Sequence, residues 1–174
     1  MKTLDTLIEK IVLAERMQNK VEHWKQQKET IVFTNGCFDI LHQGHVMYLA
    51  EAADLGSKLV VGLNADTSVR RQGKGADRPI NDERSRAILL AALSFIDLIV
   101  IFEEDTPLRL ITEIHPHILV KGGDYDVNEL DASSPTFIVG SDLVREYGGL
   151  VKTIPLLQGF STTSILERKN KSAE

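Results

Sequence analysis

Residues 30–45 read TIVFTNGCFDILHQGH, an apolar run that ends in a turn and is followed by two histidines. Residues 30–33 are β-branched or aromatic and precede an Asn-Gly pair, so we predict a short buried strand that closes in a turn. His42 and His45 then stand three residues apart with Gly44 between them, where a helix is about to begin. A buried helix face favours Leu or Ala there, so the two imidazoles need another explanation.

Helical and strand patterns alternate on both sides of this stretch. The first 25 residues place apolar side chains at helical spacing, which predicts an amphipathic helix. Beyond residue 45 the predicted elements are a helix over 45–55, a strand over 58–63, a polar stretch over 64–81, a helix over 82–94, a strand over 97–102, a helix with Thr106 as N-cap and Pro107 at its first position, and a strand over 117–123. Apolar strands separated by helices indicate a parallel sheet covered on both faces. We therefore predict an α/β fold, Rossmann-like, with three α/β/α layers and a mainly parallel sheet.

The length of 174 residues suits one domain with a sizeable core. We expect an N-terminal amphipathic helix over residues 1–27, an α/β domain over 28–168 and a polar tail over 169–174. The formal net charge of −5 argues against a general nucleic-acid binder, which would carry a basic stripe.

Cysteine use and apolar runs predict a cytoplasmic protein. Cys37 is the single cysteine, so no internal disulfide forms, and the first residues lack the pattern of a secretory signal. Apolar runs are about strand length, far below the roughly 20 residues of a membrane span, so we expect no membrane association.

The two histidines and the glycine suit a phosphate site. Ligands of open parallel sheets bind beyond the carboxyl ends of the strands, where His42 and His45 are expected to lie. Residues three apart on a helix share a face, and Gly44 lets a ligand approach the free amides at the helix start. A polyphosphate fits this pattern. A pair of structural histidines is the alternative, whereas the usual helical zinc pair stands four apart with a glutamate.

The whole stretch from Gly36 to His45 resembles the G-x-F-D-x-x-H-x-G-H signature of the cytidylyltransferase-like nucleotidyltransferases. The resemblance implies that His42 and His45 stabilise the charge that develops on the triphosphate as its α-phosphorus is attacked. It also implies that Cys37 and Phe38 line the nucleotide cleft.

Two later segments extend the resemblance. Residues 159–165, GFSTTSI, resemble the S-T-T motif of the family, which implies that Ser161, Thr162 and Thr163 meet the phosphates. A capping box of Ser164 and Glu167 is the structural alternative for part of this segment. In KGGDY, the resemblance assigns Lys121 and Asp124 to the nucleotide, although a plain turn after a strand is the other interpretation.

Basic residues cluster in the polar stretch before residue 81, at Arg70, Arg71, Lys74 and Arg78. Fixed cations stabilise charge that shifts onto a leaving pyrophosphate, so we predict a phosphate clamp with Lys74 as its catalytic member. A solvated loop is the alternative. We expect Asp39, Arg71 and Arg78 to contact the second substrate, and Arg84 either supports the site or is an ordinary surface residue.

Within that superfamily, residues 28–168 are most similar to the adenylyltransferase domain of ADP-heptose synthase. In bifunctional relatives a sugar kinase precedes this domain, so the sequence predicts a stand-alone transferase. Residues 128–147 match no motif. The resemblance implies a homodimer.

The expected reaction joins the AMP part of ATP to a sugar 1-phosphate, with Mg²⁺ carried by ATP and no metal bound by a protein cage. A heptose 1-phosphate, for lipopolysaccharide core precursors, is the substrate that the resemblance implies. A cytidylyltransferase for glycerol 3-phosphate and a non-catalytic nucleotide-binding module are the alternatives. The chain has neither the P-loop motif nor G-x-G-x-x-G after the first strand, which excludes those two nucleotide-binding classes.

Overall fold

One parallel sheet organises the chain, and its computed structural model describes residues 3–73, 78–123, 125–157 and 159–160. The sheet has six strands in the order β1-β4-β3-β2-β5-β6, and each neighbouring pair is parallel. The strands are β1 (Ile11–Leu13), β2 (Ile31–Gly36), β3 (Lys58–Asn64), β4 (Leu98–Phe102), β5 (Ile118–Gly122) and β6 (Leu150–Ile154).

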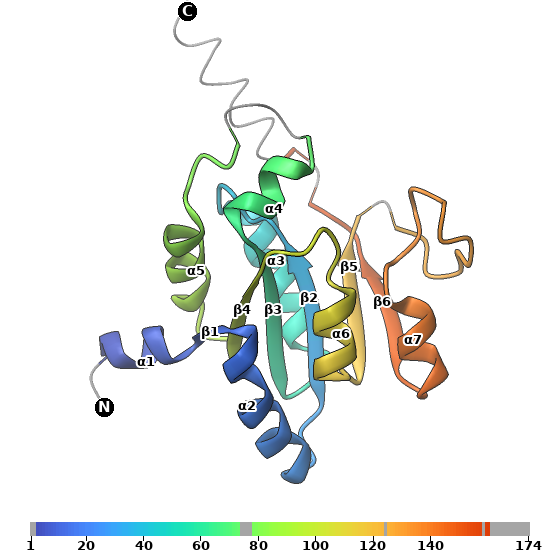
Figure 1. Cartoon of the computed structure of the whole chain (residues 1–174), viewed down its shortest axis with the longest axis horizontal. Coiled ribbons are helices and arrows are strands. Elements are labelled where there is room, and N and C mark those ends of the chain that lie inside the picture. Colours follow the sequence, from blue (N-terminus) through green and yellow to red (C-terminus); the bar gives the residue numbers. More distant parts are fainter. Residues whose placement is uncertain (1–2, 74–77, 124, 158, 161–174) are drawn as a thin grey trace, which may run out of the picture.

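Helices cover both faces of the sheet (Figure 1). The helices are α1 (Thr3–Glu9), α2 (Ala14–Gln26), α3 (Gln43–Ala53), α4 (Asp66–Arg71), α5 (Glu83–Ala91), α6 (Leu108–Ile114) and α7 (Ser141–Glu146). Residues of α1, α3 and α5 pack in one apolar cluster, and residues of α2, α6 and α7 pack in the other. The three-layer Rossmann-like α/β/α fold is therefore confirmed.

Adjacent residues of the central strands supply these two clusters. Val32 and Val61 belong to the cluster under α3 and α5, whereas Phe33 and Val60 belong to the cluster under α2 and α6. Both faces of β2 and β3 are buried, so apolar residues follow one another without the polar alternation of a half-exposed strand.

The N-terminal segment differs from the single amphipathic helix that the sequence predicted over residues 1–27. It forms α1, then β1, then α2, and β1 pairs with β4 at one edge of the sheet. Lys10 marks the break: its carbonyl accepts a hydrogen bond from Ile99 N–H at 2.8 Å, and its Nζ donates to the carbonyls of Ala91 and Leu93. The β-branched Ile11 and Val12 enter the sheet here, because a free edge of β4 offers hydrogen bonds that outweigh local helical periodicity.

Four further elements differ from the sequence prediction. The polar stretch 64–81 contains α4, and the unassigned region after residue 128 contains α7, followed by β6. β6 is an edge strand with exposed and half-buried residues, so it lacks the apolar run that revealed the other strands. Helix α6 begins at Leu108 with Pro107 as N-cap and without a side-chain cap, so Thr106 is not the N-cap.

Strand order reverses beside β2, and this reversal places the site. From β2 the chain moves through β3 to β4 on one side, and β5 and β6 lie on the other side. The connections leave β2 and β5 toward opposite faces, and they open a crevice at the carboxyl ends of the strands. These ends lie at the upper side of Figure 1, next to α4. Across the described ranges, no helix is both long and apolar enough to span a membrane.

The contact between Lys10 and the end of α5 provides a test of the corrected N-terminal topology. We expect Lys10→Met to lower the free energy of unfolding by about 1 kcal/mol, because the carbonyls of Ala91 and Leu93 lose a charged donor. Urea unfolding at pH 7 measures the change, and Lys152→Met, at an exposed β6 position, is the control. Equal stability of the two variants would contradict the observed docking of this segment.

Candidate active site

The segment between β2 and α3 forms a tight connection that carries the two histidines. Phe38 adopts a left-handed conformation with φ of 44°, and His42 is the N-cap of α3 in an extended conformation. The Nδ1 atom of His42 accepts a hydrogen bond from the backbone N–H of His45 at 3.3 Å. In the neutral ring this bond places the proton on Nε2, so His42 keeps a donor for a ligand.

The imidazole rings of His42 and His45 stack on each other, with centroids 3.8 Å apart and planes inclined by 16°. Phe38 meets the His45 ring edge-on at 5.1 Å. The two histidines therefore lie side by side, as their spacing in the sequence predicted.

Both rings are neutral near pH 7 in this state. Burial, followed by the neighbouring His42 ring, lowers the pKa of His45 to about 4, and the backbone of Ile40 opposes this shift only in part. Burial also lowers the pKa of His42 below its usual value. The Nδ1 atom of His45 is buried without a hydrogen-bond partner among the described residues. Such an atom is costly to bury unless a ligand reaches it.

Gly44, between the two histidines in the chain, packs closely against the His42 ring and Phe160. A Cβ atom at this position would lie 3.2 Å from atoms of the His42 ring and 3.2 Å from the Cβ of Phe160. A larger residue would therefore displace one of these neighbours. Ser161, Thr162 and Thr163, which follow Phe160 in the chain, lie outside the described residues. Their predicted phosphate contacts stay predictions.

A cleft of about 490 Å³ opens beside the histidines at the carboxyl ends of the strands. Its lining comes from the loops that follow β2, β3, β4 and β5, as expected for a parallel sheet. The lining residues are Asn35, Gly36, Cys37, Phe38, His45, Tyr48, Asn64, Gln72, Asp105, Thr106, Pro107, Lys121, Gly122, Tyr125, Pro135, Phe137, Val139 and Leu156.

Lys121 supplies a positive charge at the point where strand order reverses. Its side chain is largely buried at the end of β5, and its Nζ donates to Oδ1 of Asn35 at 2.5 Å, across from β5 to β2. The same Nζ lies 5.3 Å from the centroid of the Tyr125 ring. The sequence predicted Lys121, whereas Asn35 was expected only in a turn; its place beside the signature stretch, next to Gly36, was a usable signal. Asp124, also predicted, lies outside the described residues.

Asp39 and Arg78, both predicted to contact the second substrate, contact each other. Arg78 Nε donates to Asp39 Oδ2, and the backbone N–H groups of Ile80 and Asn81 donate to Asp39 Oδ1 at 2.7 and 3.0 Å. Asp39 is buried and both of its carboxylate oxygens are occupied. The pair fixes the segment before α5 against the β2–α3 connection, and substrate contacts by either residue stay a prediction.

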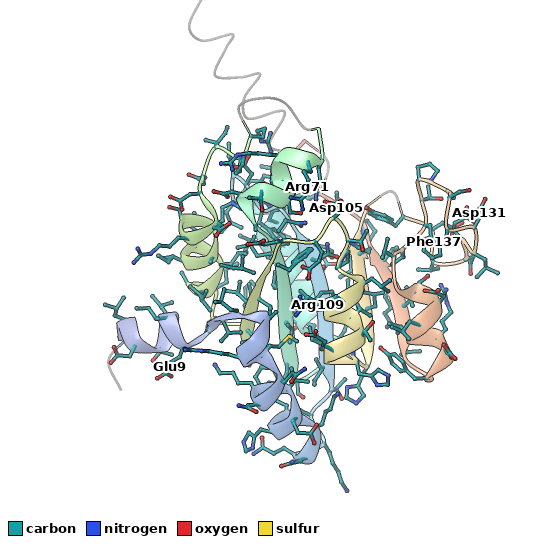
Figure 2. All side chains as sticks on the ribbon, viewed as in Figure 1. Glu9, Arg71, Asp105, Arg109, Asp131 and Phe137 are labelled. Atoms are coloured by element: carbon teal, nitrogen blue, oxygen red, sulfur yellow. The ribbon has the colours of Figure 1, made fainter. Side chains whose placement is uncertain are left out.

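The other predicted basic residues are only partly described. Arg71 is half-exposed at the end of α4, where its Nε donates to Asp105 Oδ1 at 2.6 Å and its Nη2 donates to the carbonyl of Glu103 (Figure 2). Lys74 lies outside the described residues. The phosphate clamp therefore stays a prediction, while Arg71 is shown to connect α4 to the loop after β4.

Arg86 is a second residue whose role the sequence did not reveal. It is fully buried, and its guanidinium donates to the carbonyls of Cys37, Asn64 and Asn81 at 2.6, 2.8 and 3.0 Å and to Oδ1 of Asp66 at 2.7 Å. One side chain thus joins the segments that follow β2 and β3 to the N-terminal part of α5. Arg84, which sequence analysis considered instead, is exposed.

The helical periodicity of the sequence indicated that Arg86 is buried. Arg86 is four residues before Leu90 and next to Ala87, so it lies on the apolar face of its helix. A charged residue on that face predicts a buried, fully hydrogen-bonded role.

Cys37 contributes its backbone to the same arrangement. Its carbonyl accepts from Arg86, and its thiol lines the cleft and contacts Gln72 Oε1 at 3.2 Å. The expected position of Cys37 and Phe38 at the cleft is therefore observed.

A Rossmann-like sheet, paired histidines at the start of a helix and a cleft at the strand-order reversal together define a nucleotidyltransferase. The Cytidylyltransferase-like family matches residues 33–168. The chain belongs to this family.

Known proteins show similarity over most of the chain. A bifunctional protein HldE from Syntrophotalea carbinolica is 53% identical over 159 residues, which are 91% of this chain and 31% of that protein. A bifunctional protein HldE from Bradyrhizobium diazoefficiens is 51% identical over 167 residues, 95% of this chain and 32% of that protein. The chain spans about a third of the length of these relatives.

Solved structures agree on the fold. The crystal structure of the lipopolysaccharide core biosynthesis protein from Thermoplasma volcanium has a TM-score of 0.57 and 32% identity, and the match covers 74% of this chain and 97% of that chain. Pantothenate synthetase from Thermus thermophilus, with a TM-score of 0.56 and 18% identity over 93% of this chain and 70% of that chain, shares the fold.

The buried guanidinium of Arg86 provides a matched pair of variants. We expect Arg86→Lys to lower the free energy of unfolding by roughly 3 kcal/mol, because one ammonium cannot reach the four acceptors of the guanidinium. Arg84→Lys makes the same chemical change at an exposed position of the same helix and is expected to change stability little. Guanidinium chloride unfolding compares them, and equal stabilities would disprove the role of Arg86.

Proposed function

We propose that the chain is an adenylyltransferase that joins the AMP part of ATP to a sugar 1-phosphate, with a heptose 1-phosphate as the substrate. The products are an ADP-sugar and pyrophosphate, which suits the synthesis of lipopolysaccharide core precursors. The observation that carries the proposal is the stacked pair of His42 and His45 at the start of α3, where His45 lines the cleft at the carboxyl ends of the strands. Resemblance to the adenylyltransferase domain of ADP-heptose synthase and the lipopolysaccharide-related neighbour support the choice of substrate.

The proposed chemistry is an in-line displacement without a covalent enzyme intermediate. A phosphate oxygen of the sugar 1-phosphate attacks the α-phosphorus of ATP, and the bond from the α-phosphorus to the β-bridging oxygen breaks as pyrophosphate leaves. The attacking phosphate is already ionised near neutral pH, so the enzyme supplies alignment and charge stabilisation in place of a strong base.

The residues of the cleft suit these two tasks. Nε2 of His42 is a donor for the departing phosphates at the N-terminus of α3, and the stacked ring of His45 lines the cleft beside it. Lys121 lies between the ends of β2 and β5, where the α-phosphate would join the two substrates. We assign Lys74, Ser161, Thr162 and Thr163 to the same triphosphate from the sequence signature.

Mg²⁺ enters this proposal as part of MgATP. Among residues 3–73, 78–123, 125–157 and 159–160, no group of three or more His, Cys, Asp or Glu side chains could hold a metal ion. Mg²⁺ prefers phosphate oxygens and water as ligands, so we assign the ion to the triphosphate of ATP. When bound, the ion neutralises part of the triphosphate charge.

Two other functions are compatible with the same phosphate site, and one experiment distinguishes them from the proposed function. A cytidylyltransferase for glycerol 3-phosphate would use the same phosphate site, and a nucleotide-binding module would bind ATP without turnover. Incubation with ATP or CTP and with sugar 1-phosphates or glycerol 3-phosphate, followed by mass spectrometry, distinguishes these functions. The homodimer and the cytoplasmic location are also predictions from the sequence.

Substitution of the stacked histidines tests the catalytic proposal. We expect His42→Ala and His45→Ala each to lower kcat by about 10²-fold or more, because each removes a donor to the charge that develops in the transition state. Pyrophosphate release measures turnover, and circular dichroism checks the fold. Wild-type turnover in either variant would refute the assignment.

The low pKa of His45 makes ATP binding pH-dependent. The ring is neutral above about pH 4 without ligand, and a bound triphosphate raises its pKa because an anion favours the charged imidazolium. Binding near pH 6 should therefore take up protons, and the affinity should increase as the pH falls from 7 to 5. Calorimetry in two buffers of different ionisation enthalpy measures this uptake.

The variant His45→Gln is the control for protons that ATP itself takes up. We expect the uptake to be smaller in this variant than in the wild-type protein. Equal uptake in both proteins would show that His45 does not meet the triphosphate.

A further inference from the structure

The later part of the loop from β5 to α7, within residues 128–147 that match no sequence motif, contributes an apolar wall to the cleft. Pro135, Phe137 and Val139 line the cleft at alternate positions. The residues between them face elsewhere, since Ile138 is fully buried in the core and the carbonyl of Thr136 accepts from Asp126 N–H at 3.1 Å. This part of the loop is a series of turns, in which Phe137 N–H donates to the carbonyl of Ser134 at 3.1 Å, and the turns bring these three residues to the cleft. We call Pro135, Phe137 and Val139 the apolar wall.

Contacts within the protein fix the apolar wall in place. Arg145 of α7 donates from Nη2 to the carbonyl of Val127, which holds the first part of the loop. The hydroxyls of Ser134 and Thr136 are 2.9 Å apart, and Ser141 N–H donates to the carbonyl of Ile138 at 2.9 Å. A wall that is held before a ligand arrives loses little entropy on binding.

The loop after β4 adds polar groups to the same cleft. Asp105 and Thr106 line it, and Arg71 holds one oxygen of Asp105 at 2.6 Å. Figure 2 shows Asp105 and Phe137 on separate loops at the same end of the molecule. The cleft thus combines an apolar surface with hydrogen-bonding groups. A sugar ring has the matching chemistry, with a carbon face that stacks on aromatic rings and hydroxyls around its rim.

The geometry of the displacement decides which substrate meets the apolar wall. The attacking and leaving oxygens stand in line on opposite sides of the phosphorus. The leaving phosphates belong at the start of α3, which packs on one face of the sheet. The apolar wall and Asp105 belong to the loops that lead into α7 and α6 on the opposite face. The acceptor therefore approaches from the side of the apolar wall.

We propose that the apolar wall, with Phe137 at its centre, binds the carbon face of the acceptor's sugar ring and so selects sugar 1-phosphates over short alcohol phosphates. This inference rests on the function proposed above. It names the residues that choose the acceptor, which neither the family signature nor the histidine pair specifies.

Substitution of Phe137 tests the inference in the full chain. We expect Phe137→Ala to raise the KM for the sugar 1-phosphate roughly tenfold, because the stacking face is lost. The KM for ATP and the kcat should stay near wild-type values, because the phosphate site is untouched. Phe137→Tyr keeps an aromatic ring, so its KM for the sugar 1-phosphate should stay near the wild-type value. If the Ala variant is unstable, Phe137→Leu removes the ring and keeps most of the side-chain volume.

Leu130→Ala is the matched control, since Leu130 is in the same loop, is 77% exposed and does not line the cleft. It should leave both KM values unchanged. An unchanged sugar KM in Phe137→Ala and Phe137→Leu, or a rise in the KM for ATP instead, would overturn the inference while the proposed function stands. A wild-type protein that uses glycerol 3-phosphate and no sugar 1-phosphate, or that turns over neither, would overturn both.

Discussion

The fully buried guanidinium of Arg86 is the interaction on which the rest of the site depends. A charge without water is tolerated only when its donors are satisfied, and Arg86 makes four hydrogen bonds to three carbonyls and to Asp66. Because those carbonyls belong to segments after β2 and β3 and before α5, the bonds fix the distances between loops that strand pairing leaves open. The ion pair of Asp39 with Arg78 adds a second connection, which holds the segment before α5 to the β2–α3 connection.

These bonds fix the loop that carries the histidines, whose rings are stacked and neutral in the absence of a ligand. Burial and stacking keep the ring of His45 neutral, and one of its nitrogens is unpartnered within the described residues. Two charged imidazoles at 3.8 Å would repel each other, so neutrality is what permits the stack. A site of this kind gains charge complementarity only when the anion is present, which suits stabilisation of a leaving group more than permanent binding.

In the proposed reaction, the two faces of the sheet would divide recognition between them. The start of α3, proposed to bind the phosphates, lies on one face, whereas the apolar wall and the loop after β4 belong to the other face. Lys121 and Asn35 lie between them, where β2 and β5 are neighbours. A family can therefore keep the phosphate half constant and change the acceptor by changing loops, since loops tolerate substitution better than the strands that support them.

The sequence by itself determined the fold class and the position of His42 and His45 at the start of a helix. Apolar strands between helices admit little besides a covered parallel sheet, and His42 through His45 form a contiguous signature whose spacing is set by local helical geometry. Only the tertiary structure decided that Lys10 ends a helix so that β1 joins the sheet, that Arg86 connects the loops, and that Phe137 lines the cleft. These roles depend on partners that are distant in the chain, such as β4 for β1 and Cys37 for Arg86. Local periodicity carries no information about such partners, because they are brought together only when the sheet and its helices pack.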